Sequence, residues 1–180
     1  MQKIKLIFRG ISEIVGDTEM GVIVLTDMAS TRQIAIVCDH QMEEQFTMRI
    51  GQPPMRKLLP EVLCQALWSQ GVISQFEVVI TDISNGQYLA SLVNTATMEM
   101  IPVRASDGVL LSFISEIPLY IEAKLMMRQS VPFAEDARGM SLPVNSISDD
   151  MLRQALDRAV ADENYELASC LRDEIKRRGV

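Results

Sequence analysis

The sequence has few aromatic residues, one histidine and three cysteines among its 180 positions. The cysteines, Cys38, Cys64 and Cys170, form no Cys-x-x-Cys pair and are odd in number, which argues against a disulfide framework and a zinc site. Aromatic residues make up 5% of the chain, too few to be typical of a surface that stacks single-stranded bases, so we interpret Trp68 as a packing residue. The single histidine, His40, has no serine or cysteine arrangement that predicts a catalytic triad.

Basic residues are also scarce, since 17 Lys and Arg stand against 24 Asp and Glu for a formal net charge of −7. Nucleic-acid binding depends on phosphate neutralisation by Lys and Arg, so this balance excludes a broadly basic binding surface. Contact with DNA or RNA would need a local patch. Its candidate phosphate-binding residues are Arg49, Arg56 and Lys57, which are otherwise ordinary solvated side chains.

Long hydrophobic runs are absent. No stretch approaches the ~18 apolar residues of a membrane span, and the N-terminus alternates apolar and polar residues, unlike a secretion signal. We expect a cytoplasmic protein with no membrane partner.

The first half of the chain predicts three strands followed by two helices. Residues 3–15, 22–26 and 33–38 are rich in strand formers and are separated by turn residues. Asp39 is a helix cap, followed by Met42, Phe46 and Ile50 at inward helical spacing. A second helix from about Leu58 carries Leu63 and Leu67, which we also expect to face inward.

The second half repeats the strands and adds a helix. Asn85-Gly86 predicts a tight hairpin between two strands, and a third strand is expected at 97–103. Ser106 is a plausible N-cap of the next helix, with Asp107 in its first turn. The fold class predicted is α+β: a mainly antiparallel sheet of two three-stranded meanders with helices on one face. This body spans 1–128, and a linker at 129–147 follows it.

Residues 148–180 predict an αα-hairpin with a narrow apolar stripe. The stripe includes Leu152, Leu156, Tyr165, Leu171 and Ile175. A stripe this narrow does not stabilise an isolated hairpin, so the hairpin must pack against something else. The candidates are its own body, a symmetry mate, or a matching hairpin on another protein.

The hairpin resembles the UVR motif of nucleotide-excision-repair and bacterial adaptor proteins. The resemblance rests on Leu152, Ala155-Leu156, Ala159, "ENYELA" and "LRDEIKRR". It implies docking to another protein through the apolar stripe, whose five residues named above are the predicted partner-binding residues.

The body resembles the bifunctional nuclease family of small bacterial and plant proteins. The segments that carry the resemblance are "KIKLIFRGIS", "IAIVC", Pro53-Pro54, "VVITDISNGQYLASL", "VRASDGVLLSF" and "IPLYI". The resemblance implies metal-dependent hydrolysis of DNA or RNA with Mg²⁺ or Mn²⁺, with Arg104, Ser106 and Asp107 as catalytic residues in the family's Arg-x-Ser-Asp segment. The sequence departs from the family at two places. It has Met55, Arg56 and Lys57 where the family has Thr-His-Asp, and Gln41 and Met42 where the family has Glu-Ala.

Two functions therefore stay open. The chain is a divergent nuclease, or it is a non-catalytic interaction protein whose body is a scaffold and whose hairpin docks to a partner. By analogy with other α+β bodies whose sheet has one uncovered face, we also expect a homo-oligomer.

Overall fold

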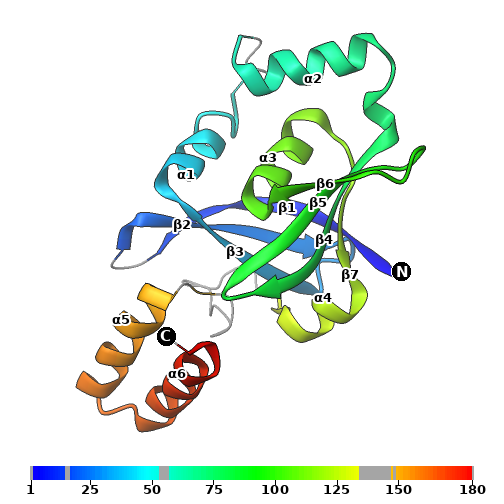
Figure 1. Ribbon diagram of the computed structural model, residues 1–180. Coiled ribbons are helices and arrows are strands. Elements are labelled where there is room, and N and C mark those ends of the chain that lie inside the picture. Colours follow the sequence, from blue (N-terminus) through cyan, green and yellow to red (C-terminus); the bar gives the residue numbers. More distant parts are fainter. Residues whose placement is uncertain (1, 15–16, 53–56, 134–146, 148, 180) are drawn as a thin grey trace.

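The computed structural model describes residues 2–14, 17–52, 57–133, 147 and 149–179. Within these residues, eight strands form one sheet in the order β6-β5-β4-β7-β1-β2-β3-β8 (Figure 1). The strands are β1 (Lys3–Ile14), β2 (Asp17–Asp27), β3 (Arg32–Asp39), β4 (Phe76–Ser84), β5 (Gln87–Asn94), β6 (Met100–Arg104), β7 (Leu119–Glu122) and β8 (Val131–Pro132). The helices are α1 (His40–Thr47), α2 (Leu59–Ser69), α3 (Ala105–Ser115), α4 (Ala123–Gln129), α5 (Asp149–Ala161) and α6 (Tyr165–Arg178).

The predicted α+β class and the C-terminal hairpin are confirmed, and the two predicted meanders are fused into one sheet. The meanders β1-β2-β3 and β4-β5-β6 are antiparallel. Strand β7 joins them, because it pairs antiparallel with β1 and parallel with β4. Parallel neighbours need a crossover, and here the chain passes through β5, β6 and α3 between β4 and β7.

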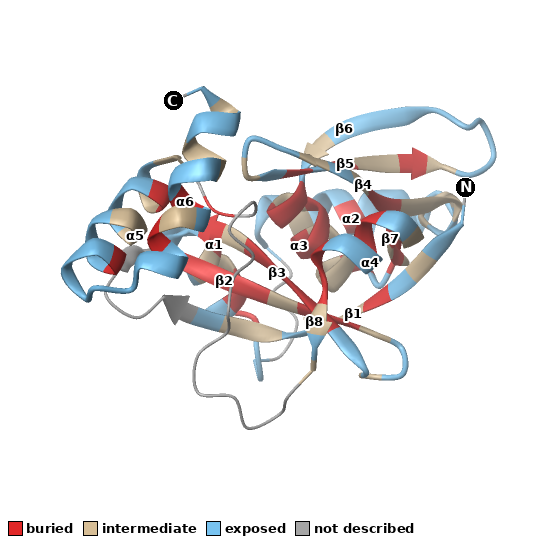
Figure 2. Ribbon diagram, turned by 90° about the horizontal axis from the view of Figure 1, so that it is seen from below, coloured by how far each residue is buried: buried red, intermediate tan, exposed pale blue. Residues whose placement is uncertain are grey.

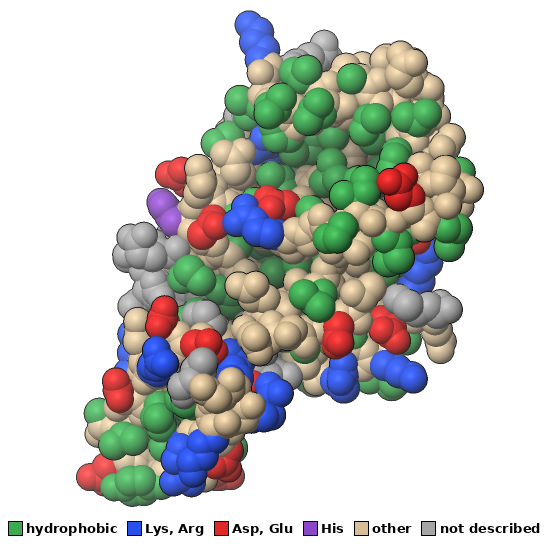
Figure 3. All heavy atoms as spheres, in the orientation of Figure 1, with side chains coloured by type: hydrophobic (Ala, Val, Ile, Leu, Met, Phe, Trp, Pro, Cys, Tyr) green, Lys and Arg blue, Asp and Glu red, His purple; other side chains and the backbone are tan. Residues whose placement is uncertain are grey.

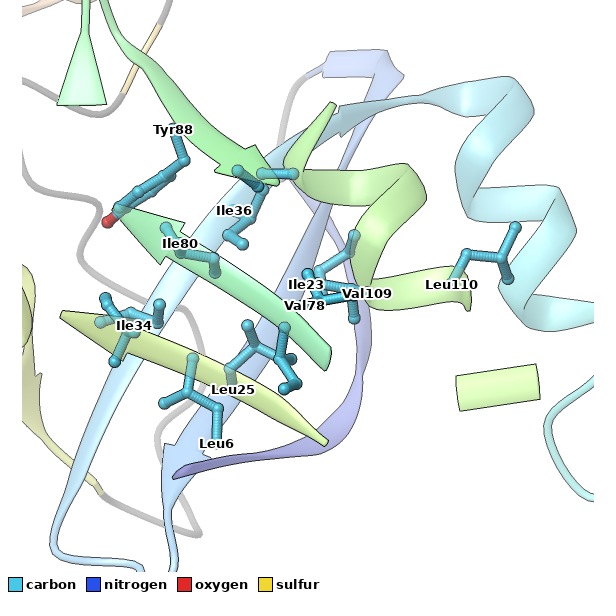
Figure 4. Close-up of a cluster of buried hydrophobic side chains, with 14 of the residues drawn as sticks. Leu6, Ile23, Leu25, Ile34, Ile36, Val78, Ile80, Tyr88, Val109 and Leu110 are labelled. Atoms are coloured by element: carbon cyan, nitrogen blue, oxygen red, sulfur yellow. The ribbon is translucent and has the colours of Figure 1, made fainter. Parts of the chain in front are cut away.

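The sheet curls around α3. This helix contacts β4, β5 and β6 at one end of the strand order and β3 near the other end. Val109 of α3 is almost fully buried and lies beside Val78 of β4 and Ile23 of β2 (Figure 4). Gly108 lets the helix approach closely, because a Cβ at this position would lie 2.9 Å from Cγ1 of Val78. Buried positions accordingly concentrate in the strands and α3, whereas the outer sides of α5 and α6 are exposed (Figure 2).

Two local predictions hold in detail. Asn85 and Gly86 have φ angles of 50° and 77°, as a two-residue hairpin between β4 and β5 requires. Asp39 caps α1, because its Oδ1 accepts a hydrogen bond of 2.8 Å from the backbone N–H of Met42.

Other boundaries differ from the prediction. Strand β2 begins at Asp17, so residues 17–21 are strand rather than turn. Arg104, not Ser106, is the N-cap of α3, and Ser106 lies inside the first turn. Residues 131–132, expected in the linker, pair with β3 as strand β8, and residues 134–146 of the linker lie outside the described residues. Ile50 follows the end of α1 and is exposed.

Helix α2 has the opposite orientation to the one predicted. Leu63 and Leu67 are exposed, and Cys64 is the helix's buried residue. A buried ion pair holds the helix in place: Nε of Arg49 lies 2.7 Å from Oε1 of Glu61, and the two side chains are 5% and 12% exposed. The apolar spacing of α2 was correct, but spacing does not tell which side of an all-round apolar helix meets the body.

We predict that Arg49→Met destabilises the protein by about 3 kcal/mol, because it leaves the Glu61 carboxylate buried without its partner. Urea unfolding monitored by circular dichroism measures this change. Arg128→Met is the matched control, because Arg128 pairs with Asp82 at an exposed site and should cost less than ~1 kcal/mol. Equal losses in both variants would contradict a structural role for the Arg49–Glu61 pair.

Candidate functional site

A cavity of about 250 Å³ opens where the first turn of α3 meets the end of β3 and the start of β5. Its polar lining residues are Asp39, Gln87, Tyr88, Arg104 and Ser106. The curl of the sheet creates this cavity, because it brings β3 and β5 together although four strands separate them in the strand order. We call it the Arg104 pocket.

Arg104 is held between two carboxylates. Its Nε lies 2.6 Å from Oδ2 of Asp107, and its Nη1 lies 3.3 Å from Oδ2 of Asp39. The hydrogen bond to Asp107 is the main reason that the pKa of Arg104 is raised. The structure thus brings the predicted residues Arg104, Ser106 and Asp107 together, and it adds Asp39, which the sequence presented only as a helix cap. The Arg104–Asp39 contact spans 65 residues of chain, and no local pattern signals it.

The other reactive groups around the pocket are protonated at neutral pH. Burial is the main cause that raises the pKa of Cys38 to about 12, and burial also raises the pKa of Tyr88. The Tyr88 hydroxyl is buried, with no hydrogen-bond partner among the described residues. All three cysteines are free thiols. Neither Cys38 nor Tyr88 is therefore an activated nucleophile.

The predicted Mg²⁺ or Mn²⁺ does not fit the described residues. Across them, no three His, Cys, Asp or Glu side chains group so as to hold a metal ion. Asp39 and Asp107 both face the Arg104 guanidinium, so a divalent cation would have to displace that charge from the carboxylates. His40 lies 3.3 Å and 3.5 Å from carboxylate oxygens of Glu43 and Glu44, its neighbours on α1.

Of the predicted phosphate-binding residues, the two that the structure describes, Arg49 and Lys57, do not line the Arg104 pocket. Arg49 is buried, and four of its five N–H donors bind Glu61 and Gln45. Its assignment as a phosphate-binding residue is replaced by the structural role described above. Lys57 is exposed and does not line the pocket. Arg56 lies outside the described residues.

The C-terminal hairpin has a core of its own. The core residues are Ile147, Leu152, Ala159, Ala168 and Leu171, and Leu156, Ile175 and Val37 of β3 pack against them. Leu152 and Leu171 are 0% and 2% exposed, so they hold the two helices together rather than offering a surface to a partner. On β3, Val37 lies between Ile36 and Cys38, whose side chains face the core of the body. Because side chains alternate along a strand, Val37 faces the opposite side of the sheet, toward the hairpin. The hairpin therefore packs on its own body, one of the three arrangements that the sequence left open.

Arg178 fixes the base of the hairpin. Its side chain is 1% exposed, and its Nη1 donates to the carbonyl oxygen of Ile147 at 2.8 Å and to Asp149 at 2.9 Å. Its Nε donates to Glu174, four residues earlier on α6, at 2.8 Å. Asp149, in the first turn of α5, is thereby tied to the last turn of α6. The hydrogen bond from Arg177 is the main cause that lowers the pKa of Glu174 to about 2.

Gly86 connects the hairpin to the Arg104 pocket. A Cβ at Gly86 would overlap the carbonyl oxygen of Ile147 and would lie 3.0 Å from Nη1 of Arg178. Gly86 and its neighbour Gln87 also line the pocket. The β4–β5 turn thus lines the pocket on one side and contacts the hairpin on the other.

Comparisons with known proteins support both parts of the chain. A family model described as the bifunctional nuclease domain matches residues 23–134, and one described as the UvrB/uvrC motif matches residues 151–177. Their order confirms the resemblances seen in the sequence. No curated protein matches the chain. In the described part of the chain, no helix has both the length and the apolar character needed to cross a membrane.

We predict that Gly86→Ala detaches the hairpin from the body. The added methyl group collides with Ile147, and the φ of 77° is itself unfavourable for alanine. Hydrogen exchange of residues 149–179 should become faster while exchange in β4 and β7 stays slow. Gly51→Ala is the matched control, because Gly51 has a φ of 70° but no atom within 4 Å of its added Cβ. The same change in both variants would show that backbone strain, not the contact with Ile147, is responsible.

Proposed function

Because this chain belongs to the bifunctional nuclease domain family and ends in a UvrB/uvrC motif, we propose that it is an interaction protein whose hairpin docks to another protein. One observation carries the proposal: the hairpin is complete and anchored, yet apolar side chains project from its tip. Val160, Tyr165 and Leu167 are 52%, 69% and 42% exposed. Tyr165 is one of the predicted partner-binding residues, and Val160 and Leu167 take the place of the buried Leu152 and Leu171.

The tip is defined by a short turn and a helix cap. Helix α5 ends at Ala161 and α6 begins at Tyr165, so a short turn connects them. Asn164 caps α6, because its Oδ1 accepts a hydrogen bond of 3.2 Å from the N–H of Leu167. An exposed tyrosine beside aliphatic side chains is typical of the few residues that dominate binding energy at interfaces.

The acidic charge of the hairpin tip indicates which kind of protein surface can bind there. The tip segment 161–166 contains three acidic residues, Asp162, Glu163 and Glu166, and no basic residue. A partner that covers Tyr165 must therefore place Lys or Arg around an apolar pocket. A second helical hairpin with basic residues near its own tip meets both requirements.

We predict that Tyr165→Ser abolishes partner binding, with a loss of about 30-fold or more in affinity, as expected for a dominant interface residue. The measurement is quantitative mass spectrometry of proteins retained from a cell extract by the tagged full-length protein, followed by titration of the retained partner. Met127→Ser is the control, because Met127 is 70% exposed but lies on α4 of the body. A partner retained equally by wild type and Tyr165→Ser would contradict docking through the tip.

Hydrolysis of nucleic acid is the second candidate, and the Arg104 pocket favours it. Arg104 and Ser106, two residues of the Arg-x-Ser-Asp segment, line the pocket, and Arg104 supplies a cation there. A phosphodiester would displace Asp39, whose contact with Arg104 is longer than that of Asp107. Asp107 would keep the guanidinium of Arg104 oriented. Asp39 would then be free to accept a proton from water.

The two candidates give opposite results in a metal and cleavage assay. Under the interaction proposal, we expect no cleavage of labelled single- or double-stranded DNA or RNA with Mg²⁺, Mn²⁺ or EDTA. We also expect Mg²⁺ and Mn²⁺ to leave the Tm unchanged, whereas specific binding at 100 times Kd would raise it by roughly 5 °C or more. Cleavage by wild type that is lost in Asp107→Asn would establish the nuclease function. Equal cleavage rates for wild type and Asp107→Asn would indicate that the cleavage site lies outside the Arg104 pocket.

A further inference from the structure

Helix α2 exposes almost all of its apolar side chains. Leu59, Val62, Leu63 and Trp68 are 70%, 47%, 56% and 53% exposed, and Leu67 is 36% exposed. Figure 3 shows hydrophobic side chains gathered over the part of the molecule that carries this helix. Single exposed apolar residues are ordinary, but an apolar helix exposed over most of its circumference is typical of a protein interface.

The body presents this surface in a fixed position. Glu61, the charged residue of α2, points to the body and binds the buried Arg49. Cys64 is buried, and α2 also packs on α3. The polar and the buried contacts of α2 thus share the side that faces the body, and the leucines are left outside.

Charge decides what covers this surface. Residues 58–76 contain one charged residue, Glu61, whose carboxylate is already paired, although the whole chain carries a net charge of −7. The helix itself offers a charged partner only Glu61, which is paired, although Lys57 is exposed immediately before this segment. Two copies of the chain repel each other where acidic residues face acidic residues, and α2, which presents no acidic group outward, is where they can approach without that cost.

We propose that two copies of the chain pack α2 against α2 around a twofold axis. Leu59, Leu63 and Leu67 recur every fourth residue, which forms a ridge that fits the groove of an identical helix. A twofold interface must complement itself, and an apolar uncharged surface does so without matched charges. Trp68, one residue after Leu67, lies about 100° further round the helix and is not part of this ridge.

The edge of the sheet does not provide this dimer contact. Strand β6 is an edge strand with the exposed residues Met100 and Ile101, but Pro102 at its centre has no backbone N–H to donate to another strand. The dimer contact is therefore made by side chains of α2 and not by extension of the sheet. This position also replaces the uncovered sheet face as the expected oligomer contact.

The test is sedimentation velocity of the full-length protein, with Leu63→Glu as the disrupting variant. We expect wild type to be a dimer at micromolar concentration and Leu63→Glu to be a folded monomer, since the substituted side chain is 56% exposed and touches no core. Met127→Glu is the matched control, with the same added charge at an exposed site on α4, and should stay a dimer. If Leu63→Glu does not fold, as judged by circular dichroism, Leu59→Lys replaces it.

A monomeric wild type would overturn the proposal and assign α2 to a different protein. A dimer that persists in folded Leu63→Glu or Leu59→Lys would also overturn it.

Discussion

The pairing of β7 with two partners holds the body together. Four residues, Leu119–Glu122, pair with β1 on one side and β4 on the other, and in this way two meanders become one sheet. Leu119 and Ile121 are buried, so the strand joins the two halves of the core as well as the two ladders. The crossover through α3 follows from this pairing, because parallel neighbours cannot be joined by a tight turn. The Arg104 pocket follows in turn, since α3 begins where the curled sheet brings β3 near β5.

Features set by nearby residues could be predicted from the sequence. Asn85-Gly86 defined the β4–β5 turn, Asp39 defined the start of α1, and the apolar spacing after Tyr165 defined α6. These depend on local dihedral angles, caps and periodicity, which a short window contains. The family segment around Arg104 likewise located one part of the candidate site.

Features set by distant residues could not be predicted. The partner of Arg104 on β3, the partner of Arg178 at Asp149 and the burial of Arg49 against Glu61 depend on how far-apart segments meet. Helix α2 shows the same limit, since its apolar spacing does not tell which of its sides meets the body. In the hairpin, the apolar stripe was identified correctly, but most of its residues pack between α5 and α6 or against Val37.

The β4–β5 turn has a thermodynamic consequence that goes beyond its geometry. Gly86 borders the Arg104 pocket and approaches Ile147, and Val37 also lines the pocket and packs on the hairpin, so the two regions share residues. A molecule in the pocket that favours one position of this turn changes the free energy of every state in which the hairpin is seated. Linkage then requires the reverse effect with the same factor, so that a protein bound to the hairpin alters affinity in the pocket equally. Such coupling would run through the residues that the two regions share.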